Sequence, residues 1–249
     1  MVQSIERAVS ILERLALGPA GVTDLASSVD LPKSTVVRLL ATLETRELVE
    51  RIPNDTRYRL GPGLTALAAG VSFTQKLTAL ARPHLIALTA SLEEASGLSV
   101  ADGYLVHYVV QVDSDQHVQI RDWTGERIAM HAVSSGQVLL AFSDPEDIAG
   151  YLSHPLGTYT PATITQPAAL RRRLADVRRR GFAWVFEEFA EGLNSVAAPI
   201  RDARGVVVGA IHTHGPGYRF PGERDQAAIA ARVVEAADSV SAHLARRTA

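Results

Sequence analysis

The sequence predicts an α+β protein of two domains, and three observations carry this prediction. The first quarter of the chain combines three short helical patterns with a hairpin pattern. From Leu98 to His214, strand patterns alternate with helical ones, and Gly61-Pro62-Gly63 marks a break between the two regions. A length of 249 residues also suits two domains. We therefore expect a first domain at 1–62, a linker helix at 63–80 and a second domain at 81–249.

The composition narrows the class of protein. Hydrophobic residues make up 47% and charged residues 21%, which is typical of a globular protein. No apolar run approaches the ~18 residues of a membrane span, and Met1–Arg7 lacks the pattern of a signal peptide. The absence of cysteine excludes disulfides, thiolate zinc sites and cysteine nucleophiles. We expect a cytoplasmic protein that makes no membrane contact.

The first domain has a defined order of elements. Apolar spacing predicts a helix that ends at Gly18-Pro19, then a short helix, and then a third helix that starts at Pro32. Val36, Leu39, Leu40 and Leu43 form the buried stripe of the third helix. The expected helices span 3–17, 23–29 and 32–46, and the expected hairpin strands span 49–52 and 56–60.

Three helices followed by a basic hairpin are the plan of a winged helix-turn-helix, whose second motif helix enters the major groove of DNA. Arg38 lies on the outward face of helix 32–46 and can reach a guanine edge, while residues at the helix start can bond phosphates. Arg57 and Arg59 share one face of the wing. The candidate DNA contacts are Lys33, Ser34, Thr35, Val37, Arg38, Thr42, Arg57 and Arg59.

The charge of this region supports DNA binding only mildly. The whole chain has a net charge of −2, so positive charge for nucleic acid has to be local. From Lys33 to Arg59, six basic residues face four acidic ones. On pattern alone, a three-helix protein-interaction module with a solvated helix face stays open as an alternative.

The second domain reads as a mostly antiparallel sheet flanked by helices. Residues 64–95 are helical in pattern, with an interruption at Pro83. The expected strands are 98–100, 106–112, 117–123, 182–186, 195–200 and 206–214, and the expected helices are 135–142, 144–152, 168–180 and 222–247.

Several motifs resemble one known family. The segments Ser4–Leu12, Leu31–Leu43 and Tyr58–Gly61 are similar to the helix-turn-helix signature of the IclR family of bacterial regulators. Val37 departs from the histidine that the family often has there, which affects the bases that are read rather than DNA binding itself.

The resemblance continues through the second domain. His131–Ala141, Gly181–Pro199 and Gly205–Pro216 are similar to further signatures of the family. The resemblance implies a GAF-like effector-binding domain that takes a small organic acid or aromatic compound. It also implies a homodimer, often paired into a tetramer, that acts on double-stranded operator DNA.

The departures from the family pattern fall where its ligand pocket would lie. His212 and His214 stand in place of two serines, and Ser195 stands in place of a frequent cysteine. Strand alternation places both histidines on one face, in line with Val206, Val208 and Ala210. The candidate ligand-binding residues are Ser134, Ser135, Gly136, Ser195, His212 and His214, with the loop at 134–136 supplying N–H groups to an anion.

Other interpretations of these residues stay open. The two histidines could be hydrogen-bonded core residues, or two ligands of a metal completed by His131 or a carboxylate. Trp123, Phe186 and Tyr151 could stack on a ligand or belong to the core. The arginine clusters at 171–173 and 178–180 are interpreted as a solvated helix face with no role beyond solubility.

An enzyme is the alternative class, since Glu187, Glu188 and Glu191 could act as acids or bases, and Ser195 with a histidine as a nucleophile. No nucleophile elbow, P-loop or H-E-x-x-H motif supports this alternative, so a structural role is expected for the three glutamates. A scaffold that does not bind DNA would leave the recognition helix unexplained. We expect a regulator without catalysis, bound metal or cofactor, in which the effector shifts the helix at 64–80 and so changes the spacing of two recognition helices.

Overall fold

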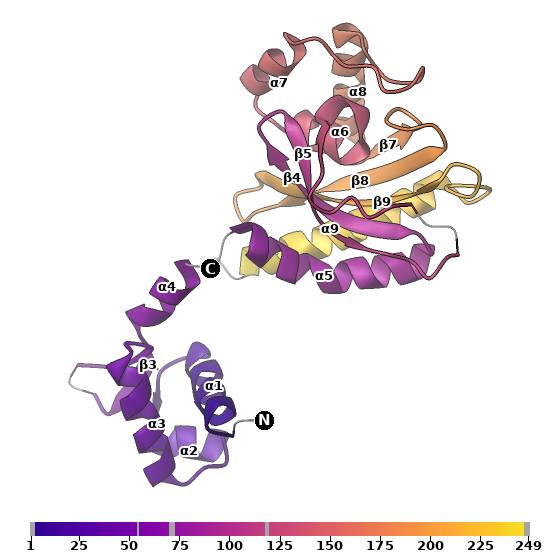
Figure 1. Cartoon of the computed structure of the whole chain (residues 1–249). Helices are drawn as coiled ribbons and strands as arrows, with labels where there is room; N and C mark the ends of the chain where they lie inside the picture. Colours follow the sequence, from indigo (N-terminus) through magenta and orange to yellow (C-terminus); the bar gives the residue numbers. More distant parts are fainter. Residues whose placement is uncertain (1–2, 54, 70–72, 118–119, 247–249) are drawn as a thin grey trace. The chain divides into compact units, whose positions relative to one another are not determined.

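The structure is a computed structural model that describes residues 3–53, 55–69, 73–117 and 120–246. The chain divides into two compact units, residues 1–72 and 73–249, and each is described by itself (Figure 1). No helix in these described ranges is both long and apolar enough to cross a membrane.

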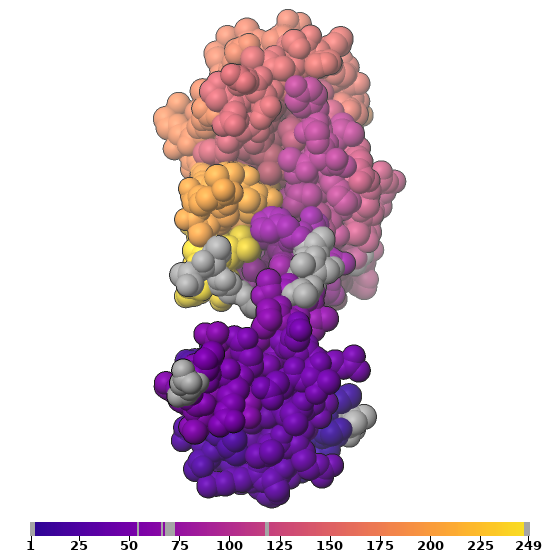
Figure 2. All heavy atoms as spheres, turned by 90° about the vertical axis from the view of Figure 1, so that its left-hand side faces the viewer, coloured from indigo at the N-terminus to yellow at the C-terminus, as the bar shows by residue number. Residues whose placement is uncertain are grey.

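The N-terminal unit contains the expected helices and hairpin. Its elements are α1 (Gln3–Ala16), β1 (Ala20–Gly21), α2 (Val22–Ser28), α3 (Lys33–Thr45), β2 (Val49–Arg51), β3 (Arg57–Leu60) and α4 (Pro62–Ala69). The strands form an antiparallel sheet in the order β1-β3-β2. Ile11, Leu25 and Leu40, one from each of the first three helices, are fully buried together. Figure 2 shows this unit, in indigo and violet, as one compact body.

The C-terminal unit is a single sheet with helices on both faces. Its elements are α5 (Phe73–Leu92), β4 (Ala95–Asp102), β5 (Leu105–Val112), β6 (Arg127–Ala129), the 3₁₀ turn η1 (Met130–Ala132), α6 (Ser134–Ala141), α7 (Pro145–Leu152), α8 (Pro167–Arg180), β7 (Ala183–Phe186), β8 (Leu193–Arg201), β9 (Val207–Pro216) and α9 (Gln226–Arg246). The six strands are antiparallel, in the order β6-β5-β4-β9-β8-β7.

An apolar layer covers each of the two faces of this sheet. One lies between the sheet and the pair α5 and α9, and contains Leu85, Ile211 and Val233. The other lies on the opposite face under α6 and α8, and contains Val138 and Leu174 (Figure 1). The expectation of an antiparallel sheet flanked by helices is therefore confirmed, and the second layer is the one that surrounds the candidate ligand site.

Helix α5 corrects one expectation, because it runs through Pro83 without interruption. Proline removes one backbone hydrogen bond from a helix. Leu77, Ala81, Leu85 and Leu88 nevertheless form a continuous buried stripe on α5, while Pro83 faces solvent. Burial of the stripe outweighs the lost bond.

The strand expected at 117–123 is a second correction. Residues 118–119 lie outside the described residues, and His117 and residues 120–123 are not in a strand. The edge strand is β6 instead, which pairs with β5. The backbone N–H of Trp123 donates to the side-chain oxygen Oε1 of Gln111 on β5 at 3.3 Å. Residue 123 therefore contacts β5 through a side-chain hydrogen bond and does not pair with it as a strand.

The alternation expected along β9 is wrong at its start. The register of β8 with β9 shifts at this point, because Ile200 pairs with Gly209 while Arg201 pairs with Val207. Val208 is therefore left without a partner on β8, as the extra residue of a β-bulge. Val208 consequently packs toward α5 and α9, while Ala210 packs toward α6 and α8.

Candidate DNA interface and ligand cavity

Helix α3 presents one apolar face and one exposed face. Val36, Leu40 and Leu43 are buried against the rest of the N-terminal unit. The candidate contacts on the opposite face are exposed, with Thr35 half-buried beside them. The exposed members are Lys33, Ser34, Val37, Arg38 and Thr42. Val37 is 50% exposed, which leaves an apolar side chain in the middle of a polar face.

The cations of this face are available to a ligand. Within the described part of the chain, the side chains of Lys33 and Arg38 make no hydrogen bond or ion pair. The Thr42 hydroxyl, in contrast, donates to the Arg38 carbonyl oxygen at 3.0 Å, so it is already engaged within α3.

The turn before α3 fixes the position of this helix. Asp30 adopts a left-handed backbone conformation with φ of +50°, which reverses the chain after α2. The Leu31 N–H then donates to the Ala26 carbonyl oxygen at 3.0 Å. A tight turn at Asp30-Leu31 therefore joins the two helices of the motif.

The wing arginines are exposed but already paired. Arg57 lies 2.6 Å from Asp55, and Arg59 lies 2.6 Å from Glu50. The hydrogen bond from Arg57 holds the pKa of Asp55 below its ordinary value. A phosphate that met this wing would have to compete with two carboxylates.

In the C-terminal unit, one small cavity lies between the sheet and α6. Four of the predicted ligand residues line it: Ser134, Ser195, His212 and His214. The cavity also has the side chains of Tyr108, Trp123 and Phe189 in its wall. Its interior measures about 20 Å³, which is room for no more than about one water molecule.

Ser135 and Gly136 do not line the cavity. Gly136 has another task, since a β-carbon there would lie 2.3 Å from the Met130 carbonyl oxygen. Helix α6 therefore packs directly on the backbone of the turn that precedes it.

The two cavity histidines lie close together and are deeply buried. Their ring centroids are 5.6 Å apart and nearly parallel. His212 Nδ1 lies 3.2 Å from Ser99 Oγ, but the Nε2 atoms of His212 and His214 are buried without a partner within the described part of the chain. The interpretation of both as fully hydrogen-bonded core residues therefore does not describe these Nε2 atoms.

Burial keeps both imidazoles neutral. Burial lowers the pKa of His214 to about 4, although Asp113 and Asp122 oppose this shift. Burial, and then the neighbouring His214, lower the pKa of His212 well below its ordinary value. Burial likewise raises the pKa of Tyr108 to about 12, so this phenol stays protonated.

Gly97 leaves space for the His212 side chain, and it was not among the predicted site residues. It lies directly across from His212 in the β4–β9 pair. A β-carbon at Gly97 would lie 2.7 Å from His212 Nε2. The sequence carries no signal for this requirement, because the pairing of β4 with β9 has to be known first.

The three aromatic residues named as possible stacking partners go to different places. Trp123 lines the cavity. Phe186 stacks on Trp184, with ring centroids 5.3 Å apart, and Tyr151 accepts the His131 backbone N–H at 3.0 Å. Tyr108 and Phe189, which line the cavity, were not among the candidates.

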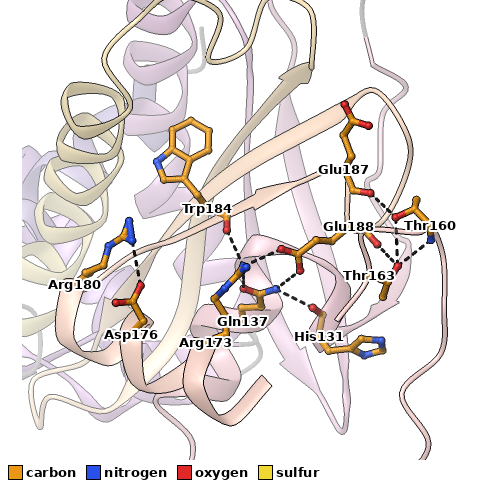
Figure 3. A network of polar contacts seen from close by, with 10 residues as sticks. All are labelled: His131, Gln137, Thr160, Thr163, Arg173, Asp176, Arg180, Trp184, Glu187 and Glu188. Carbon is orange, nitrogen blue, oxygen red and sulfur yellow. Dashed lines mark hydrogen bonds and ion pairs between the residues drawn. The ribbon is translucent and has the colours of Figure 1, made fainter. Parts of the chain in front are cut away.

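A network of polar contacts connects α6, α8 and the loop after β7, and the side chains of Gln137 and Glu188 in it are buried (Figure 3). Arg173 Nη1 donates to Glu188 Oε1 at 2.8 Å and to Gln137 Oε1 at 3.1 Å. Gln137 Nε2 donates to Glu188 Oε2 and to the His131 carbonyl oxygen. The network joins α6 and α8 to the loop after β7, and gives Glu188 the structural role that was expected of it.

The arginine clusters of α8 correct the expectation of a purely solvated face. Arg173 pairs with a carboxylate that is 4% exposed. Arg178 donates to the carbonyl oxygens of Ala141 and Ser143, at the end of α6. Sequence periodicity could not reveal these partners, since they lie more than thirty positions away or in a loop.

Among the described residues, the histidine pair has no third side chain placed to complete a metal site. In the described ranges, no group of three or more histidine and acidic side chains is arranged to hold a metal ion. His131 is engaged elsewhere, with its ring nitrogens bonded to Tyr151 Oη and the Gly157 carbonyl oxygen.

A winged helix-turn-helix unit with an exposed cationic recognition helix, joined to an α+β unit with an internal cavity, defines a DNA-binding transcription regulator. Residues 4–53 match the family model of the IclR helix-turn-helix domain, and residues 71–242 match that of the bacterial transcriptional regulator IclR C-terminal domain. The chain belongs to the IclR family of bacterial transcriptional regulators, and it is a regulator rather than an enzyme.

Relatives cover the chain from end to end. It is 32% identical to the HTH-type transcriptional regulator BhcR of Paracoccus denitrificans, over 99% of this chain and 88% of the relative. It is 36% identical to the glycerol operon regulatory protein of Streptomyces griseus, over 88% of this chain and 87% of the relative. A crystal structure of an IclR homolog from Microbacterium hydrocarbonoxydans, complexed with 4-hydroxybenzoate, superposes with a TM-score of 0.64 at 28% identity and covers 99% of this chain and all of that one.

Proposed function

We propose that this regulator reads operator DNA with the exposed face of α3 and that a small aromatic acid in the cavity of the C-terminal unit controls its binding to DNA. The observation that carries this proposal is the cavity itself, where two buried imidazole Nε2 atoms have no partner among the described residues. Unsatisfied polar atoms in an apolar cavity favour a ligand that can bond them. The bound 4-hydroxybenzoate of the Microbacterium homolog supports the same ligand class.

The aromatic wall and the start of α6 fit such an acid. Trp123 and Phe189 line the cavity and pack edge to face with ring centroids 5.5 Å apart, so an aromatic ligand would meet aromatic side chains there. Val133 and Ser134, which cap and begin α6, also line the cavity, so the positive end of the helix dipole favours an anionic group there. Because the cavity is nearly filled in this structure, an effector has to expand it, and binding is thereby linked to a change of shape.

On the DNA side, Arg38 is the best candidate for base recognition. Its guanidinium has no partner within the described residues, and it lies on the exposed face with Val37 and Thr42, whose methyl groups suit thymine. Lys33, Ser34 and Thr35 at the start of α3 are proposed to hold phosphates. Arg57 and Arg59 would contact the backbone after exchanging their carboxylate partners for phosphate.

We further propose that the regulator acts as a homodimer. Ile5 and Val9 lie one turn apart on α1 and are 62% and 46% exposed. An exposed apolar stripe on a helix favours contact with a second copy, and two copies would match the half-sites of a palindromic operator. Pairing of dimers into a tetramer, and the helical linker at 63–80, stay predictions.

The Arg38→Ala variant is expected to bind the DNA upstream of its own coding sequence roughly 5- to 150-fold more weakly, because a bidentate guanine contact contributes about 1–3 kcal/mol. The Arg38→Lys variant keeps the charge without the planar fork, so its salt dependence should resemble that of the wild type while its sequence discrimination falls. Fluorescence anisotropy over a range of salt concentrations measures both effects.

The matched control for this experiment is Arg171→Ala, which removes an exposed arginine from α8 in the other unit. Its DNA affinity should stay within about twofold of the wild type. An equal loss in Arg171→Ala and Arg38→Ala would show that α3 does not have the proposed role.

A further inference from the structure

The cavity offers an anion no fixed positive charge. None of the described residues that line it carries an ammonium, a guanidinium or a carboxylate. The polar groups that line the cavity beside the pair of histidines are the Tyr108 phenol from β5, Ser134 from α6 and Ser195 from β8. Ser99 from β4 contacts His212 Nδ1 at 3.2 Å. An anionic ligand therefore meets only hydroxyl groups, a helix terminus and two imidazoles.

Among the described residues that line the cavity, the imidazoles are the groups that can take up a positive charge. The Arg121 guanidinium lies over the ring of Trp123, 4.1 Å from its centroid, and is already paired with Glu126. His212 and His214 are 2% and 3% exposed, so solvent does not screen them. Asp113 and Asp122, in the connection after β5, are the charged groups that act on His214 from outside the cavity, and both favour its protonated form. The two rings are only 5.6 Å apart, so a second proton on the pair would be opposed by the first.

We propose that the His212–His214 pair makes this site proton-linked, so that an anionic aromatic acid enters the cavity together with one proton. This inference rests on the proposed function, since it requires the acid to occupy this cavity. In the empty site both imidazoles are neutral at pH 7, because burial has lowered their pKa values. A carboxylate or phenolate beside Nε2 reverses this preference, because an adjacent opposite charge favours the charged imidazole.

The direction of the pH dependence follows from linkage. The complex holds one proton more than the separate protein and ligand, so a fall in pH favours the complex. Affinity is gained as pH falls below the pKa of the pair in the complex, and the gain ends near the lower pKa of the empty site. The regulator would then respond more strongly to the same acid concentration in a more acidic cell.

Isothermal titration calorimetry with 4-hydroxybenzoate tests this inference. Titrations in phosphate and in bis-Tris at about pH 6.5 give the protons taken up, and we expect about one per site. The Kd should rise by up to about tenfold per pH unit between about pH 5.5 and about pH 7.5, a range in which this ligand keeps its carboxylate ionised and its phenol protonated.

Two double variants separate the pair from other histidines. The His212→Ser/His214→Ser variant should lose the proton uptake and the pH dependence. The matched control is His84→Ser/His243→Ser, a pair on α5 and α9 whose rings are 5.4 Å apart but outside the cavity, and it should keep both. If the double variant fails to fold, the single variant His214→Gln takes its place in the experiment. It retains an uncharged polar side chain, and it should reduce the proton uptake.

The outcomes distinguish this inference from the proposed function. Binding of 4-hydroxybenzoate without proton uptake would overturn the inference and leave the proposed function standing. Uptake that persists in His212→Ser/His214→Ser would also overturn it, because another group would hold the proton. Absence of any binding between about pH 5.5 and about pH 7.5 would overturn both.

Discussion

The Arg173→Ala substitution is expected to lower the free energy of unfolding of the C-terminal unit by about 3 kcal/mol. Arg173 pairs with the buried carboxylate of Glu188 and also donates to Gln137 and to the Trp184 carbonyl oxygen. Its removal leaves a buried carboxylate with Gln137 as the one remaining side-chain donor among the described residues. Urea denaturation followed by tryptophan fluorescence measures the effect on this unit, because both tryptophans of the chain, Trp123 and Trp184, lie in it.

The pH dependence of this variant identifies the carboxylate as the cause. Burial raises the pKa of Glu188, while Arg173 and Gln137 oppose this shift. Without Arg173 the folded-state pKa rises further above the unfolded-state value, so the folded state binds a proton more tightly. Stability is then regained as pH falls, and the deficit should shrink between about pH 7 and about pH 5.

The control for this prediction is Arg172→Ala, the adjacent position on α8, where the side chain is exposed. It should change the free energy of unfolding by no more than about 0.5 kcal/mol. Equal destabilisation by the two variants, or a deficit in Arg173→Ala that does not change with pH, would contradict the assigned role of the network.

The Gly136→Ala variant is expected to destabilise the same unit by about 1–3 kcal/mol. Alanine is intrinsically better than glycine in a helix by about 1 kcal/mol, so any destabilisation must come from packing. The added β-carbon would lie 2.3 Å from the Met130 carbonyl oxygen and 2.5 Å from its Cα, and these backbone atoms cannot yield without moving the turn before α6.

Gly150→Ala is the matched control, because Gly150 is also inside a helix, α7. Its added β-carbon would meet the Tyr104 hydroxyl, the end of a partly exposed side chain that can rotate away. We expect no destabilisation, and a gain of up to about 1 kcal/mol. If Gly136→Ala were as stable as Gly150→Ala, α6 would not depend on the close contact with Met130.

Local patterns predicted elements that bury one face, such as α3 and β9, although Pro83 made the pattern of α5 look interrupted. The stripe of α3 and the alternation around His212 and His214 placed the exposed recognition face and the histidine pair correctly. Four of the six predicted ligand residues line one cavity, and two of these, Ser134 and Ser195, were predicted from the family resemblance rather than from a local pattern. The individual DNA and ligand contacts stay predictions, since they require the partner molecules.

The features that local patterns missed depend on distant parts of the chain. Gly97 is needed only because β4 pairs with β9, and the extra residue Val208 appears only in the register of β8 with β9. The tasks of Arg173 and Arg178 are likewise set by partners on other elements. Strand order and side-chain partners are properties of the tertiary structure, and one sequence does not encode them in its periodicity.

The most direct test of the central claim is the affinity for the upstream DNA, measured by fluorescence anisotropy with and without saturating 4-hydroxybenzoate. We predict that the acid changes this affinity roughly 5- to 150-fold, the range of a typical coupling free energy. The His212→Ser/His214→Ser variant should bind DNA normally without the acid and respond less to it. An unchanged DNA affinity, in a protein to which the acid is shown to bind, would contradict the claim that the cavity controls the DNA-binding unit.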